Sequence, residues 1–89
     1  MNTSVNRDRP VARSVEITED ELRVSLADGR LISVPLVWFP RLVSASSEAL
    51  AHWELLGDGE GIHWPDVDED VSVAGLLAGY AAPGALGAA

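Results

Sequence analysis

The sequence contains no cysteine, no lysine and no apolar stretch long enough to span a membrane. Without cysteine, disulfides, thiolate metal sites and cysteine nucleophiles are excluded. Without a membrane-length run, and without a charged and apolar leader at the start, the sequence predicts a cytoplasmic protein that binds no membrane. A chain of 89 residues has room for one small domain with a thin margin of stability.

The chain also lacks any basic residue after Arg41. Residues 1–45 carry six acids and all six arginines, whereas residues 46–89 carry eight acids, so the formal net charge of −8 lies entirely in the second half. This distribution disfavours direct binding to nucleic acid, whose phosphates are held by lysine and arginine. It fits either a solvated surface that keeps a small protein soluble or a face for a protein partner with a basic surface.

The two ends have little to pack. Residues 1–12 are polar without a clear period and are expected to form a disordered arm. Residues 80–89 are almost all alanine and glycine and are expected to form a disordered tail. A single folded domain is therefore predicted over residues 13–79.

Alternating apolar and polar residues predict three strands, around residues 14–17, 22–27 and 31–36. A three-residue loop between the second and third strands places Val24 opposite Ile32 on one apolar face, whereas a two-residue turn would place it opposite a serine. That loop requires Gly29 in the left-handed conformation of a G1 bulge.

The rest of the domain is predicted to be mostly helical. One short helix begins at Pro40 and runs to about residue 45; a second is capped by Ser46 or Ser47 and extends to Trp53. Glycines at 57, 59 and 61 form a turn before a short strand at 62–64.

Residues 66–70 are expected to form an acidic loop, and Ser72 to cap a last helix that ends near Gly79. The predicted order is β-β-β-α-α-β-α. This is an α+β fold, a small antiparallel sheet of three to four strands packed with two or three short helices.

No motif of an enzyme or of a metal site is present. Asp66, Asp68 and Asp70 alternate as in a calcium loop, but Val71 and Leu77 stand where that loop needs glycine and glutamate. No nucleophile elbow, P-loop or dinucleotide fingerprint occurs. We therefore predict a protein that is not an enzyme and has no cofactor and no metal.

The two histidines are the remaining candidates for chemistry. The spacing of His52 and His63 matches no standard zinc motif. A histidine at the edge of the core, hydrogen-bonded to an acid, is the favoured role for His63. An enzyme or metal-dependent regulator built on these histidines and the aspartates stays open as a hypothesis, beside the two non-enzymatic hypotheses given below.

Tryptophan is abundant for so small a chain. Trp53 and Trp64 are expected in the core, whereas Trp38 is left open between core and surface. In the functional interpretation, Trp38 and Phe39 are partly exposed beside Arg41, because they stand where the chain leaves the sheet; tryptophan with arginine is typical of binding hot spots.

Several stretches between Leu22 and Gly79 resemble one family. They are Asp28-Gly29-Arg30, Val34-Pro35-Leu36, Phe39-Pro40-Arg41-Leu42, Trp53, Gly61-Ile62-His63-Trp64-Pro65, Asp68-Glu69-Asp70 and Val71 to Leu77. In order and spacing they resemble the small prokaryotic domain-of-unknown-function family numbered 2442, over about two thirds of the chain.

The resemblance implies a compact α+β domain with no established catalytic residue. It also implies a gene that often lies beside that of another small protein, an arrangement that has suggested toxin–antitoxin pairs. The first hypothesis is therefore a small non-enzymatic protein-interaction module, the antitoxin-like partner of a neighbouring small protein. The alternative is an acidic inhibitor of the anti-CRISPR or other phage anti-defence type, which mimics nucleic acid and blocks a basic channel.

Both hypotheses draw on the same predicted partner-binding residues. These are Trp38, Phe39, Arg41, Asp66, Asp68, Glu69 and Asp70. A homodimer is favoured over a monomer, because a three-stranded sheet leaves an edge that pairing across a two-fold axis would cover. Trp38, Phe39 and the first strand are the predicted interface of that dimer.

Overall fold

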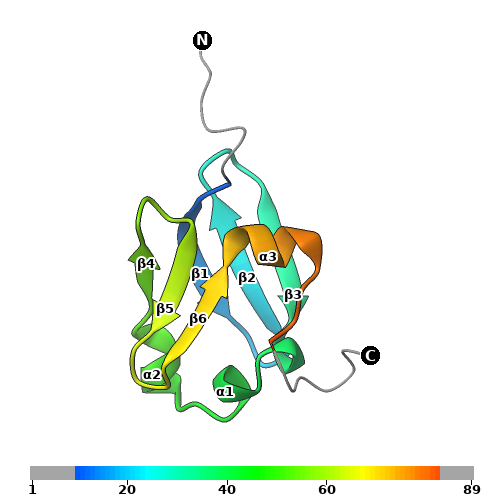
Figure 1. The fold of residues 1–89 in the computed structure, drawn as a ribbon. Helices are drawn as coiled ribbons and strands as arrows, with labels where there is room; N and C mark the ends of the chain where they lie inside the picture. Colours follow the sequence, from blue (N-terminus) through cyan, green and yellow to red (C-terminus); the bar gives the residue numbers. More distant parts are fainter. Residues whose placement is uncertain (1–9, 83–89) are drawn as a thin grey trace.

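The computed structural model describes residues 10–82 and contains two three-stranded antiparallel sheets, three short α-helices and a 3-10 turn (Figure 1). The α+β class and the order of the predicted elements are confirmed. Two short strands are additional, and they complete a second sheet. Of the arm predicted over residues 1–12 and the tail predicted over residues 80–89, residues 1–9 and 83–89 lie outside the described residues.

The first sheet, sheet A, comprises β1 (Ala12–Ile17), β2 (Glu21–Leu26) and β3 (Leu31–Pro35). The predicted register is confirmed, since Val24 lies opposite Ile32. The Leu26 N–H donates to the Arg30 carbonyl at 2.8 Å, which closes the three-residue loop. Gly29 has a φ of 97°, the left-handed conformation that this loop requires.

The connection from sheet A runs through η1 (Leu36–Trp38), α1 (Pro40–Val43) and α2 (Ser47–Ala51). Ser46 caps α2 by accepting a hydrogen bond from the Ala49 N–H at 3.1 Å. The helix ends at Ala51, so the prediction that it would include Trp53 is wrong. Trp53 lies half-buried just past the helix and packs against the core.

The second sheet, sheet B, comprises β4 (Glu54–Leu56), β5 (Gly61–Trp64) and β6 (Glu69–Ser72), followed by α3 (Val73–Ala78). The prediction of an acidic loop over residues 66–70 is wrong for its last two residues, which begin β6. Residues 69, 71 and 73 are buried whereas 70 and 72 are exposed. This period of two is the pattern of a half-buried strand. Ser72 caps α3 as predicted.

The two sheets share one hydrophobic core. Sheet B packs over sheet A, with α3 crossing beside β3 (Figure 1). The seven largest fully buried side chains come from both sheets and the helices: Trp64, Leu22, Leu26, Leu42, Ile62, Val24 and Val73. Trp64, the largest of them, donates its indole N–H to the Leu50 carbonyl at 3.1 Å, so its polar atom is satisfied.

The ends of the described chain are tied to this core. The Ala12 N–H donates to the Gly59 carbonyl at 2.7 Å, and Val11 and Ala12 are buried. The Ala82 N–H donates to the Trp38 carbonyl at 2.9 Å. The packed body thus includes residues that the sequence assigned to the arm and the tail. No helix within residues 10–82 is long and apolar enough to cross a bilayer.

Candidate functional site

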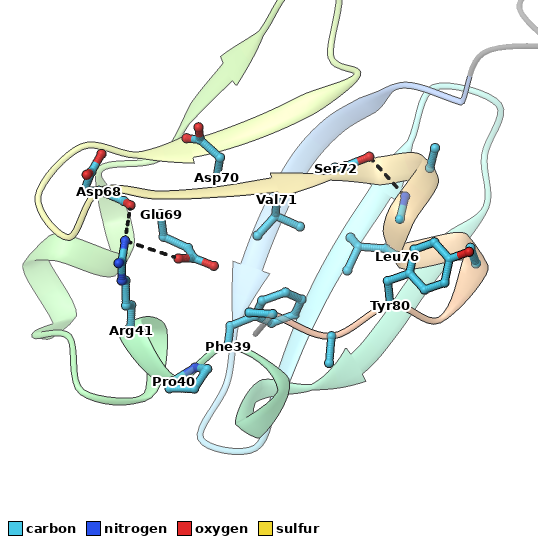
Figure 2. Close-up of a pocket in the computed structure, with 15 residues that line it drawn as sticks. Phe39, Pro40, Arg41, Asp68, Glu69, Asp70, Val71, Ser72, Leu76 and Tyr80 are labelled. Carbon is cyan, nitrogen blue, oxygen red and sulfur yellow. Dashed lines mark hydrogen bonds and ion pairs between the residues drawn. The ribbon is translucent and has the colours of Figure 1, made fainter. Parts of the chain in front are cut away.

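A groove of about 1030 Å³ runs along the outer edge of β6 (Figure 2). It lies between α1 on one side and α3 with the following residues 80–82 on the other. Its apolar lining includes Phe39, Val71, Leu76 and Tyr80, and its charged lining is Arg41, Asp68, Glu69 and Asp70. The groove therefore has a mixed surface, an apolar floor with a predominantly acidic rim.

The groove is lined by residues from both faces of β6, so it includes the edge of the strand between them. All five residues from Asp68 to Ser72 line it, although successive side chains of a strand point to opposite faces. Within the described residues, β6 pairs only with β5, so its other edge has no strand beside it. Main-chain groups on that edge therefore face the groove.

Register identifies which main-chain groups these are. The Val73 N–H donates to the Glu60 carbonyl at 3.0 Å, so this pair is a hydrogen-bonded one. Hydrogen-bonded and non-hydrogen-bonded pairs alternate along an antiparallel ladder. Asp70, opposite His63, is in a non-hydrogen-bonded pair, and its N–H and C=O point away from β5. The Ser72 N–H points the same way.

Glu69 is the most buried acid of the described chain. Its side chain is 12% exposed, because β6 turns it to the inner face of the sheet together with Val71. Arg41 Nη1 donates to the Asp68 carbonyl at 2.7 Å and lies 3.9 Å from Glu69 Oε1. That ion pair exceeds hydrogen-bond length, and no hydrogen bond within residues 10–82 reaches the Glu69 carboxylate.

Burial raises the pKa of the Glu69 carboxyl above its ordinary value. The Arg41 guanidinium opposes this shift, and the neighbouring carboxylates of Asp70 and Asp68 add to it. The groove thus holds a largely buried carboxylate whose oxygens still reach solvent and that no group within residues 10–82 hydrogen-bonds. Such a group gains from any external donor or cation placed beside it.

Five of the seven predicted partner-binding residues meet at this groove: Phe39, Arg41, Asp68, Glu69 and Asp70. Phe39 is only 4% exposed, so it belongs to the floor and to the core. The expectation that Phe39 is partly exposed beside Arg41, and its place in a dimer interface, are therefore corrected. The reason is that Phe39 caps η1 and α1 and turns inward between them.

The other two predicted residues lie outside the groove. Trp38 does not line the groove and is half-buried against the core, and its carbonyl accepts a hydrogen bond from the N–H of Ala82 in the groove wall. Asp66 lies in the β5–β6 turn and accepts a hydrogen bond from His52 Nδ1 at 3.0 Å. This hydrogen bond, and then the charge of Asp66, raise the pKa of His52.

His63 forms a second, separate pair on sheet B. Its Nδ1 hydrogen-bonds Asp70 Oδ1 across the β5–β6 ladder, in agreement with the predicted histidine–acid contact. That hydrogen bond is the main cause of the raised pKa of His63. Across residues 10–82 no three histidine or acidic side chains gather as a metal-binding group. The two histidines are each held by a different aspartate.

Sequence reasoning missed the α3 side of the groove. Leu76 and Tyr80 line it, but residues from Tyr80 onward were assigned to a tail with nothing to pack. The Tyr80 N–H donates to the Gly75 carbonyl at 2.9 Å, where Gly79, with a φ of 85°, ends the helix. An aromatic residue directly after such a glycine was the available indication that the chain folds back.

Comparisons with known proteins agree on the fold and identify a family. The family model described as "Protein of unknown function (DUF2442)" matches residues 12–82. A crystal structure of a protein of unknown function from Rhodospirillum rubrum is 32% identical with a TM-score of 0.71, over 86% of this chain and 95% of that one.

A solution NMR structure of an uncharacterized protein from Chromobacterium violaceum is 25% identical with a TM-score of 0.73, over 94% of this chain and 91% of that one. No curated protein matches the chain. The family match covers both sheets, α3 and the whole groove, and it agrees with the resemblance carried by the sequence stretches above. The chain belongs to the DUF2442 family of proteins of unknown function.

Proposed function

We propose that this protein is a small non-enzymatic interaction module that binds a protein partner with a basic surface through the groove beside β6. The observation that carries the proposal is the composition of that groove. Its floor is apolar, and its charged lining sets three consecutive acids against one arginine, Arg41. Of these acids, Glu69 turns to the inner face, and Asp68 and Asp70 are exposed. Interfaces combine a desolvated apolar centre with charges complementary to those of the partner.

The antitoxin-like role implied by the family resemblance is the most direct form of this proposal. The partner would then be the small protein encoded by the neighbouring gene. The test is a pull-down of that gene product, together with rescue from its toxicity on co-expression. Failure both to bind and to rescue would remove the antitoxin-like role.

The groove itself is tested by charge removal. Asp68→Asn with Asp70→Asn is expected to weaken binding of the basic partner about tenfold or more at low salt. Glu16→Gln with Glu19→Gln removes the same charge from β1 and the turn after it, and serves as the matched control. Equal loss in both double variants would show that net charge, and not the groove, determines binding.

The nucleic-acid mimic is the less favoured candidate on geometry. Mimicry needs carboxylates arrayed on one open face, like phosphates. Of the four acids predicted for such a face, Glu69 turns inward and Asp66 and Asp70 each hold a histidine. Affinity for a basic partner that survives replacement of these acids and is insensitive to salt would dispose of mimicry altogether.

The homodimer remains a separate prediction. With Phe39 in the core, such a dimer would use the outer edge of β1 and the hollow beside it, which is lined by Val15, Ile17, Leu50 and Trp53. Analytical ultracentrifugation at physiological salt tests it. A single species near 9 kDa over a wide concentration range would show the dimer to be wrong.

A further inference from the structure

From the edge of β6 we infer how the partner is held. The partner inserts a short extended segment that adds to sheet B as a fourth strand, antiparallel to β6, and its sequence is apolar–any–basic, with an arginine or lysine side chain reaching Glu69. This inference rests on the proposed function and specifies the segment that the groove accepts.

The first step is the open main chain. The Asp70 N–H and C=O and the Ser72 N–H face the groove and have no strand beside them in the described chain. An unpaired edge of this kind is the template used when proteins bind extended peptides by strand addition. A partner residue opposite Asp70 would exchange both main-chain hydrogen bonds with it.

The second step is the length of the opening. At one end of the open edge, the Asp68 carbonyl already accepts a hydrogen bond from Arg41. At the other end, α3 begins at Val73. Between them the strand spans about 13 Å, at roughly 3.3 Å per residue. The partner therefore contributes only three to five extended residues, and side chains must supply the specificity.

The third step is the side-chain pattern. Partner residues opposite Glu69 and Val71 point to the inner face, into the groove, because those two side chains do. Val71 with Phe39 and Leu76 offers an apolar contact, and the Glu69 carboxylate offers an acceptor that no donor in the described part of the chain hydrogen-bonds. In an antiparallel arrangement the apolar residue precedes the basic one by two positions.

The fourth step is the exclusion of a second copy of this chain as the occupant. Pairing two β6 edges would bring Asp68 and Asp70 of one copy against the same acids of the other. Like charges placed directly opposite each other in a ladder are destabilising. A segment with a cation is complementary to the same edge.

The probe is the capped peptide acetyl-Thr-Val-Thr-Arg-Thr-amide, titrated into the ¹⁵N-labelled full chain and followed by NMR. The Asp70 and Ser72 amides are expected to shift and to exchange more slowly with solvent when the peptide is bound. Three control peptides have Glu in place of Arg, Arg and the preceding Thr exchanged, or an N-methyl group on the central Thr. Each is expected to lose about tenfold or more in affinity.

Glu69→Gln is the decisive protein variant, because it keeps the shape of the side chain and removes its charge. It is expected to lower affinity for the arginine peptide about tenfold. Glu54→Gln removes one charge from sheet B outside the groove and should leave affinity nearly unchanged. Melting curves check the fold, and Glu69→Gln should melt no lower than the wild type, because it removes a buried charge.

Equal affinity of the N-methylated peptide, or of Glu69→Gln, would overturn strand addition at this edge. Shifts confined to the hollow between β1 and α2, or groove amides that change with protein concentration alone, would overturn it too. If the basic partner is captured in the groove but leaves the Asp70 and Ser72 amides unshifted and unprotected, the inference fails and the proposed function stands. If the peptide binds as described but no basic protein is captured, the inference stands and the proposed function fails.

Discussion

Sheet A and sheet B have the same number of strands and the same antiparallel pairing, but they differ in length and charge. The strands of sheet A are five to six residues long, and those of sheet B three to four. Residues 12–35 carry three arginines and five acids, a net charge of −2. Residues 54–72 carry seven acids and no base, a net charge of −7.

The difference separates the part of the molecule that folds from local pattern from the part that depends on packing. Sheet A has a regular register between β2 and β3 with a tight hairpin, and its β1–β2 ladder shifts register once, between Ala12 and Ser14. Sheet B, with short and mutually repelling strands, is held by the side chains that it buries against sheet A, Ile62, Trp64 and Val71 among them. Within residues 10–82, the outer edge of sheet B along β6 has no strand beside it.

Trp64→Ala gives the largest expected effect and tests whether sheet B is independent. Loss of this fully buried indole should lower the free energy of unfolding by about 3–5 kcal/mol, and Leu22→Ala in sheet A by about 2–5 kcal/mol. Urea unfolding measures both, with Trp53→Ala as a milder, half-buried control. If Trp64→Ala leaves the amides of sheet A protected from exchange, the single shared core is wrong.

Gly59→Ala tests the link between the sheets. Gly59 has a φ of 109°, and a Cβ built there lies 2.6 Å from the Ala12 carbonyl oxygen. Gly29, in the hairpin of sheet A, has a φ of 97° and nothing within 4 Å of such a Cβ. Both substitutions carry backbone strain of about 1–3 kcal/mol.

Only Gly59→Ala adds a clash with backbone, so it should destabilise the protein by more than Gly29→Ala. Because the two glycines share a positive φ, the difference between their midpoints of urea unfolding isolates that clash. Equal midpoints would mean that the contact between Gly59 and Ala12 is dispensable.

The smallest expected effect is a contrast in pH dependence. The raised pKa values of His52 and His63, caused by Asp66 and Asp70, mean that their stabilisation is complete below about pH 6.5 and is lost as the pH rises through the raised values. In sheet A the main-chain N–H of Arg30, donating to the carboxylate, lowers the pKa of Asp28, whose contribution is lost only as the pH falls through that lowered value.

The melting temperature should therefore fall between pH 6 and pH 8.5, and more weakly in a His52→Gln, His63→Gln double variant. Because the pKa of Glu69 is raised, deprotonation of this carboxyl also lowers stability as the pH rises above about 4.5. The double variant is therefore needed to separate the contribution of the histidines from that of Glu69. Thermal unfolding at low salt measures the slope. If the melting temperature of the double variant falls with pH as steeply as that of the wild type, the two histidine–aspartate pairs do not contribute to stability.

Much of the fold could be predicted from the sequence because many of its elements depend on residues close together in the chain. The period of two around Val24, the loop at Gly29 and the caps at Ser46 and Ser72 each need only neighbouring residues to be inferred. The short strand β6 was missed because three consecutive acids resemble a solvated loop. Its alternation is visible only if Glu69 is allowed to be buried, which composition alone argues against.

The candidate site was accessible in its residue types and not in its geometry. Arg41, Asp68, Glu69 and Asp70 were predicted as partner-binding residues, and the groove gathers all four. That Trp38 and Asp66 lie elsewhere, and that Leu76 and Tyr80 join, depends on how α3 folds back onto β6. The spacing of residues along the chain does not predict that contact.

By itself the sequence determined the α+β class, the register of the hairpin and the concentration of negative charge after Arg41, because each follows from residue order. Only the tertiary structure decided that Glu69 turns inward, that Phe39 is buried and that no strand of residues 10–82 pairs with the second edge of β6. The physical reason is that the face and edge a strand exposes depend on its packing and pairing partners. Those partners lie far away in the sequence.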